Sequence, residues 1–166
     1  MRAINAGIYG LTSLATWVFL GLGERASAQS SGNLLFDGLI LDVCVLTISS
    51  SGTLTPNSTY TELSSSNGGG SPGGATAVTT NSDFNLVIDA PAGFSAMPSG
   101  GDANVTYDAS VDASGVTILG GVGTGVLSSL GLGLTNLSIN ASATKAAGVF
   151  PAGSYQLPVT IRCVSS

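Results

Sequence analysis

Apolar and polar positions alternate in short runs along most of the chain after residue 38, and clusters of Gly, Ser, Pro and Asn separate these runs. A period of two places successive side chains on opposite faces of a β-strand, whereas a helix needs a period of 3.6. The runs predict strands at residues 39–49, 53–55, 59–63, 75–80, 83–89, 103–111, 115–119, 134–144 and 155–163. Residues 126–133 fit either a short helix or a strand edge. Eight or nine strands at intervals of about 8–12 residues are typical of an antiparallel β-sandwich.

The composition of the chain favours the same all-β class. Ser, Thr, Gly, Ala, Val and Asn dominate after residue 28, while Lys and Glu are nearly absent. Exposed helix faces would therefore lack their usual residues, whereas β-branched and turn-forming residues are abundant. Residues 39–49 are apolar on both faces, which predicts a central strand. The run SSSNGGGSPGG at residues 64–74 predicts a flexible, solvated loop.

The first 28 residues have the three parts of a cleavable secretory signal peptide. Arg2 supplies the positive charge, residues 6–22 form an uncharged apolar stretch, and Ala26-Ser27-Ala28 is a small-x-small cleavage site. An uncleaved membrane anchor is the alternative, but the stretch is interrupted by glycines and falls short of the roughly 20 residues that a spanning helix needs. We therefore expect a signal-peptide helix at 1–28, a single β-sandwich domain at 29–166, and export to the periplasm, cell surface or medium.

Two cysteines remain after the signal peptide, one near each end of the domain. Cys44 shares its strand face with Leu46 and Ile48, and Cys163 shares its face with four side chains of the last strand, Tyr155, Leu157, Val159 and Ile161. Both sulfur atoms are thus expected on the core side, and exported domains provide an oxidising environment for pairing. The sequence predicts a Cys44–Cys163 disulfide that stabilises the fold by roughly 4–5 kcal/mol. Two buried free thiols, or a bridge to another subunit, are the alternatives.

The charge of the exported domain excludes several classes of partner. Lys145 and Arg162 are its two basic residues, against eight acidic ones that give a net charge of −6: Asp37, Asp42, Glu62, Asp83, Asp89, Asp102, Asp108 and Asp112. Two cations cannot neutralise several phosphates, so we expect no binding to nucleic acid. The same argument disfavours an anionic membrane surface. No segment after residue 28 is apolar enough to predict a transmembrane span.

The residues available for catalysis are few. The chain contains no histidine, which removes Ser-His-Asp, Cys-His and His-metal sites. A Ser-Lys dyad would have to use Lys145, which is expected in a turn, and nothing marks a partner serine. A glycosidase pair could combine Glu62 with an aspartate, although scattered acids are more typical of a solvated surface. We therefore expect no catalytic residues, no cofactor and no enzymatic activity.

Three weaker motifs have structural explanations as well as functional ones. Residues 120–125 (GGVGTG) are similar to a phosphate-binding loop but lack its GK[ST] ending, so a glycine-rich hairpin or bulge is expected. Three loop acids could contribute to a calcium site, but they lack DxDxDG spacing and no metal site is predicted: Asp102, Asp108 and Asp112. Four sites match the N-glycosylation sequon, which such a composition produces by chance: Asn57, Asn104, Asn136 and Asn140.

The C-terminal region contains a motif that resembles one known protein family. The segment Phe150-Pro-Ala-Gly-Ser-Tyr155, followed by alternating Leu157, Val159 and Ile161, resembles the PAG-x-Y turn and terminal strand of bacterial pilin-like, immunoglobulin-like secreted domains. These include chaperone–usher fimbrial subunits and the spore-coat-U-type group. The resemblance covers about 20 residues and implies an immunoglobulin-like sandwich that assembles or adheres at the cell surface. The resemblance also implies three kinds of partner for this protein: other copies of the same chain, other surface subunits and a periplasmic chaperone.

The chain departs from that family in two respects. Pilins that polymerise by strand donation carry an N-terminal extension of alternating apolar residues, whereas here Leu34-Leu35-Phe36 precedes the first strand without clean alternation. A bridge between Cys44 and Cys163 would also lock the two ends of the domain, and a complete sandwich needs no donor strand. Two hypotheses follow: a structural or adhesive subunit, for example of a fimbria, and a monomeric binding module, for example for glycan, that uses loops at one end of the sandwich.

Overall fold

A computed structural model describes residues 35–166, so the predicted signal peptide and its helix at 1–28 lie outside the described residues. The chain divides into two units, Met1–Asp37 and Gly38–Ser166. Of the first unit, residues 35–37 are described, and they have no regular structure. The second unit contains ten β-strands, and residues 35–166 contain no helix. Accordingly, this part of the chain has no helix long and apolar enough to cross a membrane.

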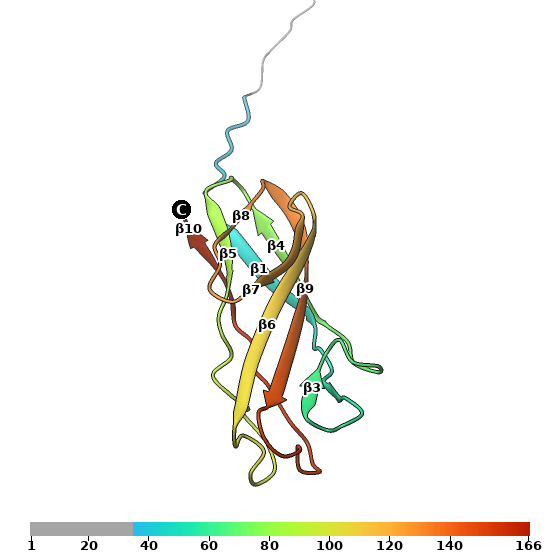
Figure 1. The fold of residues 1–166 in the computed structure, drawn as a ribbon. Helices are drawn as coiled ribbons and strands as arrows, with labels where there is room; N and C mark the ends of the chain where they lie inside the picture. The colour runs from blue at the N-terminus through green and yellow to red at the C-terminus, as the bar shows by residue number, and fades with distance from the viewer. Residues whose placement is uncertain (1–34) are drawn as a thin grey trace, which may run out of the picture. The chain divides into compact units, whose positions relative to one another are not determined.

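The larger of two antiparallel sheets is organised around its longest strand, β9 (Figure 1). One edge of β9 pairs with β6 over eleven residue pairs, and β6 pairs in turn with β7. The other edge of β9 pairs first with β4 and then with β3, which continue to β1 and β2 respectively. The seven strands are β1 (Cys44–Ser50), β2 (Thr55–Pro56), β3 (Glu62–Ser64), β4 (Gly73–Thr79), β6 (Val105–Gly115), β7 (Leu119–Gly123) and β9 (Gly133–Lys145).

The smaller sheet has three strands in the order β10-β5-β8 and covers part of the larger one. Its strands are β5 (Phe84–Ile88), β8 (Ser128–Leu130) and β10 (Ile161–Ser165). Side chains from both sheets form the main core, including Leu86, Ile88 and Leu130 from the small sheet. The large sheet contributes Ala75, Ala77, Val111 and Leu137. This all-β, antiparallel, two-sheet arrangement agrees with the predicted sandwich class.

Alternation along the strands produces the two faces of the large sheet. In β4, Ala75, Ala77 and Thr79 are buried, while Val78 between them is exposed. Glycine is needed where β6 ends: Gly115 has a φ of +111°, and a Cβ there would lie 2.7 Å from the Leu134 carbonyl oxygen. The chain can therefore turn between β6 and β7 at this position only because the residue lacks a side chain.

Several predicted strand boundaries are wrong, including those of the first and last strands. The first strand begins at Cys44 rather than at residue 39, and it lies at the edge of the large sheet rather than in its centre. The last begins at Ile161 rather than at residue 155. Residues 126–133 contain the short strand β8, and 115–119 are the end of β6, a turn and the start of β7. Residues 73 and 74 belong to β4 rather than to a loop.

Candidate functional site

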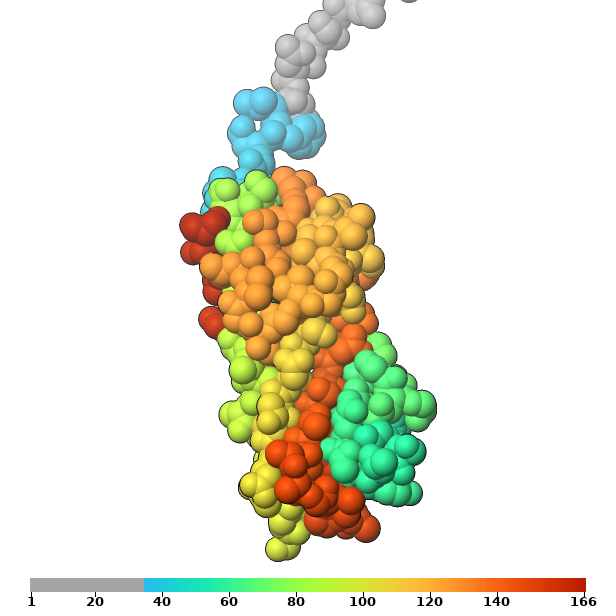
Figure 2. Space-filling view, viewed as in Figure 1, coloured from blue at the N-terminus to red at the C-terminus, as the bar shows by residue number. Residues whose placement is uncertain are grey.

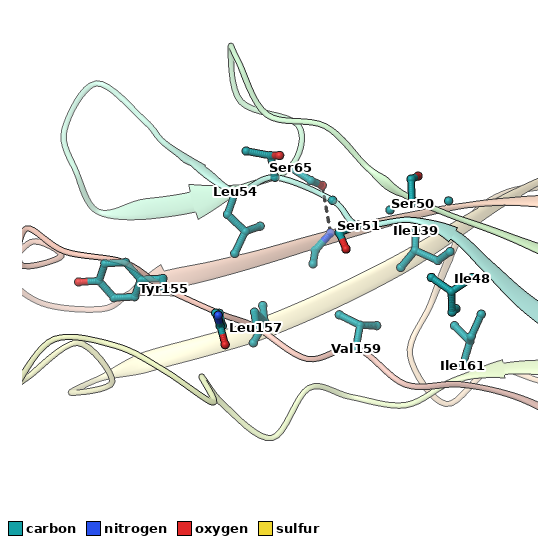
Figure 3. Close-up of a pocket in the computed structure, with 16 residues that line it drawn as sticks. Ile48, Ser50, Ser51, Leu54, Ser65, Ile139, Tyr155, Leu157, Val159 and Ile161 are labelled. Carbon is teal, nitrogen blue, oxygen red and sulfur yellow. Dashed lines mark hydrogen bonds between the residues drawn. The ribbon is translucent and has the colours of Figure 1, made fainter.

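A groove of about 490 Å³ lies on the open side of the sandwich (Figure 3). One wall is formed by the end of β1 and the chain that follows it, and the opposite wall by residues 155–161. The β9 residues Ile139 and Ala141 also line it. Figure 3 shows Leu157, Val159 and Ile161 along one wall, with Ile48 and Leu54 opposite. A groove of this size, with apolar side chains on both walls and polar groups among them, is within the usual range of ligand sites.

Ile48 shows that this part of the inner face is uncovered. It follows Cys44 and Leu46 on the same face of β1 and pairs with the buried Ala75. An inward-facing isoleucine would normally be buried, because its apolar surface is stabilised by removal from water. Ile48 is nevertheless 67% exposed. Within residues 35–166, no strand lies over the inner face at this position.

The opposite wall of the groove repeats the same pattern. Tyr155, Leu157, Val159 and Ile161 are half-buried, while the residues between them are exposed. Residues 157–160 form no strand, although Gln156 makes an isolated antiparallel bridge with Ala96. Pro158 has no N–H to donate, so it interrupts any hydrogen-bonded ladder along this wall. The two walls thus face each other with apolar side chains but without a strand between them.

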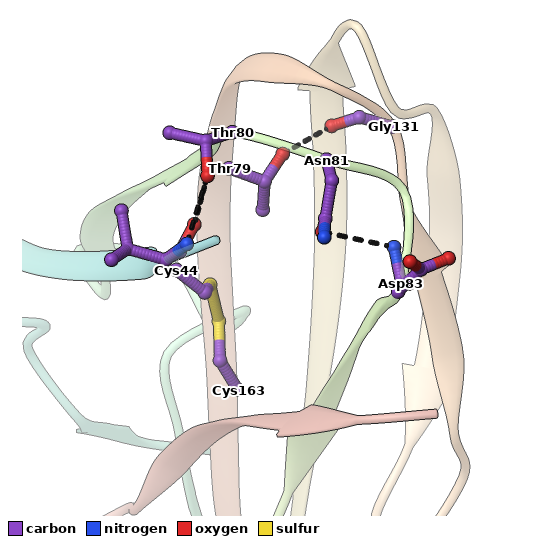
Figure 4. The surroundings of a disulfide bond; sticks show 8 residues. Cys44, Thr79, Thr80, Asn81, Asp83, Gly131 and Cys163 are labelled. Atoms are coloured by element: carbon purple, nitrogen blue, oxygen red, sulfur yellow. Dashed lines mark hydrogen bonds between the residues drawn. A yellow bond between two sulfur atoms is a disulfide. The ribbon is translucent and has the colours of Figure 1, made fainter. Parts of the chain in front are cut away.

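A disulfide lies beyond one end of the groove. Cys44 at the start of β1 is bonded to Cys163 in β10, with 6.2 Å between their Cα atoms (Figure 4). The predicted pairing is therefore confirmed, and residues 35–166 contain no free cysteine. The bond joins an edge strand of each sheet, but it lies beyond Ile48 and Ile161, leaving the groove open below it. The bond therefore joins the two sheets without covering the apolar walls of the groove.

An aromatic cluster closes the other end. The Tyr155 ring lies 5.0 Å from the Phe94 ring and 5.5 Å from the Phe150 ring, measured between centroids. Phe94 also packs edge-on against Tyr107 at 5.1 Å. The Tyr155 hydroxyl donates a hydrogen bond to the Pro151 carbonyl at 2.6 Å, and burial raises the pKa of this tyrosine. These contacts fix the position of Tyr155, which belongs to the PAG-x-Y segment, at this end of the groove.

The apolar residues before β1 are exposed rather than part of a strand. Leu39, Ile40 and Leu41 are 85%, 81% and 66% exposed. Leu35 and Phe36 are 83% and 85% exposed as well. We call residues 35–41 the lead. Its connection to β1 is held in place, because the Thr80 hydroxyl donates to the Leu41 carbonyl at 2.8 Å and accepts from the Val43 N–H at 2.8 Å.

Lys145, the one candidate for a Ser-Lys dyad, has a structural environment. It is the last residue of β9 and is buried. Its Nζ donates hydrogen bonds to the carbonyls of Gly100 at 3.0 Å and Ala103 at 2.8 Å. The Nζ also lies 5.3 Å from the centroid of the Phe150 ring, within cation–π range. Lys145 therefore ties the 100–103 loop to the aromatic cluster.

The acidic residues and the glycine-rich segment are likewise used in local structure. One Asp112 carboxylate oxygen accepts from the Gly121 N–H at 2.7 Å and the other from Asn140 Nδ2 at 3.2 Å. Residues 120–123 belong to β7, so the glycine-rich segment forms a hairpin with β6, as expected. Among residues 35–166, no group of three acids or cysteines is placed to hold a metal ion. Glu62 lies in β3 opposite Thr144.

The four sequons differ in how accessible their side chains are. The Asn57 side chain accepts hydrogen bonds from the N–H groups of Thr61 and Glu62. The Asn140 amide bonds to Asp112, and its oxygen accepts from Ser65 Oγ. Asn104 and Asn136 are exposed.

No family model matches the chain, and no curated protein matches it.

The groove was not predicted from the sequence, although the inward orientation of side chains on its two walls was. The alternation of residues 155–161 and of residues 44–48 indicated which side chains point inward, and both assignments hold for the walls of the groove. Alternation does not reveal whether a second layer covers those side chains. The one available signal was the double-faced apolarity of residues 39–49, which has an excess of apolar residues for an edge strand.

Proposed function

We propose that this protein is an exported, non-catalytic structural subunit that assembles with other copies of itself at the cell surface. In this proposal the domain is immunoglobulin-like and pilin-like, and the lead of one copy fills the groove of the next. The observation that carries the proposal is Ile48, an inward-facing apolar side chain that is 67% exposed on the wall of a groove. A strand laid in the groove would remove this side chain from water.

The wall from Tyr155 to Ile161 is seven residues long, and the chain from residue 35 to residue 41 is long enough to lie along it. Seven residues of extended chain span about 23 Å. β1 has one strand neighbour within residues 35–166, so its other edge offers backbone N–H and C=O groups to an added strand. Such strand addition combines main-chain hydrogen bonds with pockets for alternate side chains.

Export and disulfide formation fit the same function. Residues 1–28 have the pattern of a secretory signal, and disulfides persist in oxidising compartments. The bond holds β1 to β10 at one end while the groove stays open below it. A subunit built in this way would remain folded while its groove is empty, which favours assembly from soluble monomers.

A complementation experiment tests the proposal. The full chain is expressed with its own signal, and the exported, oxidised protein is run unheated on a non-reducing SDS gel. We expect a heat-labile ladder for the natural chain, and monomers for Ile48→Asp, which blocks the groove, and for Leu39→Asp/Ile40→Asp, which blocks the lead. Mixing these two variants should restore dimers but no longer species, since one functional lead then meets one functional groove.

The matched control is Val149→Asp, because Val149 is 58% exposed and lies outside the groove lining. It should form the same ladder as the natural chain. A monomer band for the natural chain at every concentration would overturn the proposal, as would a ladder that survives both blocking variants. Thermal unfolding of each variant checks that loss of the ladder does not reflect loss of the fold.

One observation favours the second candidate, a monomeric glycan-binding module. A smaller hollow of about 190 Å³ on the large sheet is lined largely by hydroxyl, amide and carboxylate side chains: Ser64, Ser66, Asp108, Ser110, Asn140 and Ser142. Sugars are bound through such groups, although this hollow lies on the sheet face rather than among loops at one end. A glycan array probed with the monomeric Leu39→Asp/Ile40→Asp variant, with Asp108→Asn as the control for specific binding, would decide between the two functions.

A further inference from the structure

The outer face of the large sheet is polar except in one place. Side chains that lie opposite each other across four strands carry hydroxyl or amide groups in one row: Thr47, Thr76, Asn136 and Ser114. The neighbouring row, toward the disulfide, is entirely aliphatic: Val45, Val78, Leu134 and Val116. We call these four residues the apolar row.

The members of the apolar row are adjacent in the sheet. Val45 pairs with Val78, and Val78 pairs with Leu134. The Val116 N–H donates to the Leu134 carbonyl at 3.2 Å, so Val116 lies next to the start of β9. Paired residues on one face have Cβ atoms about 4.5–5.5 Å apart, which makes the row continuous from Val45 to Leu134.

The apolar row is exposed and is extended by its neighbours. Its residues are 52%, 42%, 50% and 52% exposed in the order Val45, Val78, Leu134 and Val116. Leu132 and Ile118 add 65% and 83% exposed side chains beside it. Figure 2 shows the 115–120 turn and the β8–β9 segment packed side by side at this end of the domain. Single exposed apolar residues are ordinary, but a contiguous patch marks a surface that binds something.

We infer that the apolar row is covered by a second copy of this chain, namely the copy whose groove holds the lead. This inference rests on the proposed function and adds a second contact to the same assembly. The lead leaves the domain beside the apolar row, because Thr80 binds Leu41 and Val43 and is two residues from Val78. Two extended residues, Asp42 and Val43, span about 7 Å. A copy that holds residues 35–41 must therefore touch the end of the domain that carries the apolar row.

The charges near the apolar row favour an uncharged protein partner over a lipid surface. The charged residues closest to it in sequence are Asp42, Asp83 and Asp112, all of them acidic, and the first two are exposed. Of the two basic residues after residue 28, Lys145 is buried and Arg162 is paired with Asp89 at 2.7 Å. An anionic membrane would be repelled by this end of the domain. An adjacent subunit with apolar residues around its groove would not be repelled by these acidic residues.

The test compares a free lead with a lead attached to its domain. The acceptor is the exported Leu39→Asp/Ile40→Asp chain, whose groove is intact, and its binding is measured to two partners. One is a synthetic peptide of residues 33–43, and the other is the exported Ile48→Asp chain, which carries the lead and the apolar row. We expect the attached lead to bind at least tenfold more tightly than the peptide. Val78→Lys/Leu134→Lys in the donor chain should reduce its affinity to that of the peptide.

Two control variants separate this contact from effects on folding. Val149→Lys in the donor changes an equally exposed valine outside the apolar row and should leave the affinity unchanged. The milder pair Val78→Thr/Leu134→Thr preserves strand-forming residues and should weaken binding in the same direction. Unfolding temperatures of all donor chains establish that each is folded.

The outcomes distinguish the two proposals. If the peptide binds but Val78→Lys/Leu134→Lys leaves donor affinity unchanged, the inference about the apolar row is overturned and the proposed assembly stands. If neither peptide nor donor binds the acceptor, both are overturned. If the natural chain binds phosphatidylcholine vesicles through Val78 and Leu134 while donor affinity is unaffected by their substitution, the row contacts lipid and the inference is overturned in that way.

Discussion

Leu46 and Ile48 lie two residues apart on the same face of the same strand, yet their environments differ completely. Leu46 packs against the main core, which β5, β8 and β10 cover. Ile48 lies where that cover ends and is 67% exposed. The covered half of the inner face contributes stability, while the uncovered half is free to bind. The proposed function therefore depends on where the second layer stops, rather than on a special set of residues.

The largest expected effect comes from the disulfide, which lies in the covered half. Cys44→Ser/Cys163→Ser should lower the free energy of unfolding by about 4–5 kcal/mol, because the bond closes a loop of 119 residues. Urea denaturation of the natural and double-variant proteins measures the difference. A loss below about 1 kcal/mol would mean that the covered core alone holds the two sheets together.

Truncation of one side chain in each half tests the comparison directly. Leu86→Ala should cost about 3 kcal/mol, since Leu86 is 1% exposed and its loss leaves a cavity. Ile48→Ala should cost less than about 1 kcal/mol, because most of its surface already contacts water. Denaturant midpoints of the two variants, each made in the monomeric Leu39→Asp/Ile40→Asp chain, are the measurement. Equal losses would show that Ile48 is covered within the monomer itself.

The aromatic end of the groove should depend on Lys145. Lys145→Met should lower the free energy of unfolding by about 2 kcal/mol, because it removes charge-assisted hydrogen bonds to the carbonyls of Gly100 and Ala103. Tyr155 fluorescence should change in the same variant, since both residues contact Phe150. Thermal melts and emission spectra check this, with Lys145→Arg as a control that keeps the charge. Unchanged fluorescence would show that the end wall does not need Lys145.

The smallest effect is expected at the exposed ion pair between β10 and the end of β5. Arg162 donates two hydrogen bonds to the Asp89 carboxylate, and these bonds hold the pKa of that carboxyl below its ordinary value. The stabilisation is present above the unfolded pKa of about 3.9 and is lost as pH falls through the lower folded value. The Asp89→Asn variant should thus have a slightly lower unfolding temperature than the natural chain at pH 7, and this difference should vanish at low pH. A difference that persists below pH 2 would point to packing rather than charge.

The fold class and the disulfide were predictable because both depend on local alternation. Cys44 and Cys163 face inward with their apolar neighbours in β1 and along residues 155–163, as the period of two requires. The boundaries of the same two segments were not predictable. Residues 39–43 lack a partner strand and bond instead to Thr80, and Pro158 interrupts the ladder before β10. A strand exists only where another backbone supplies its hydrogen bonds.

The sequence by itself determined which side of each segment is apolar, that the elements are strands, and where the two sulfur atoms could meet. Tertiary structure alone decided that β1 is an edge strand, that Ile48 is uncovered, and that Val45, Val78 and Leu134 form one row. The physical reason is that alternation is a property of neighbouring residues. Coverage and cross-strand register depend on segments far apart in the chain, and these meet only when the sheets assemble.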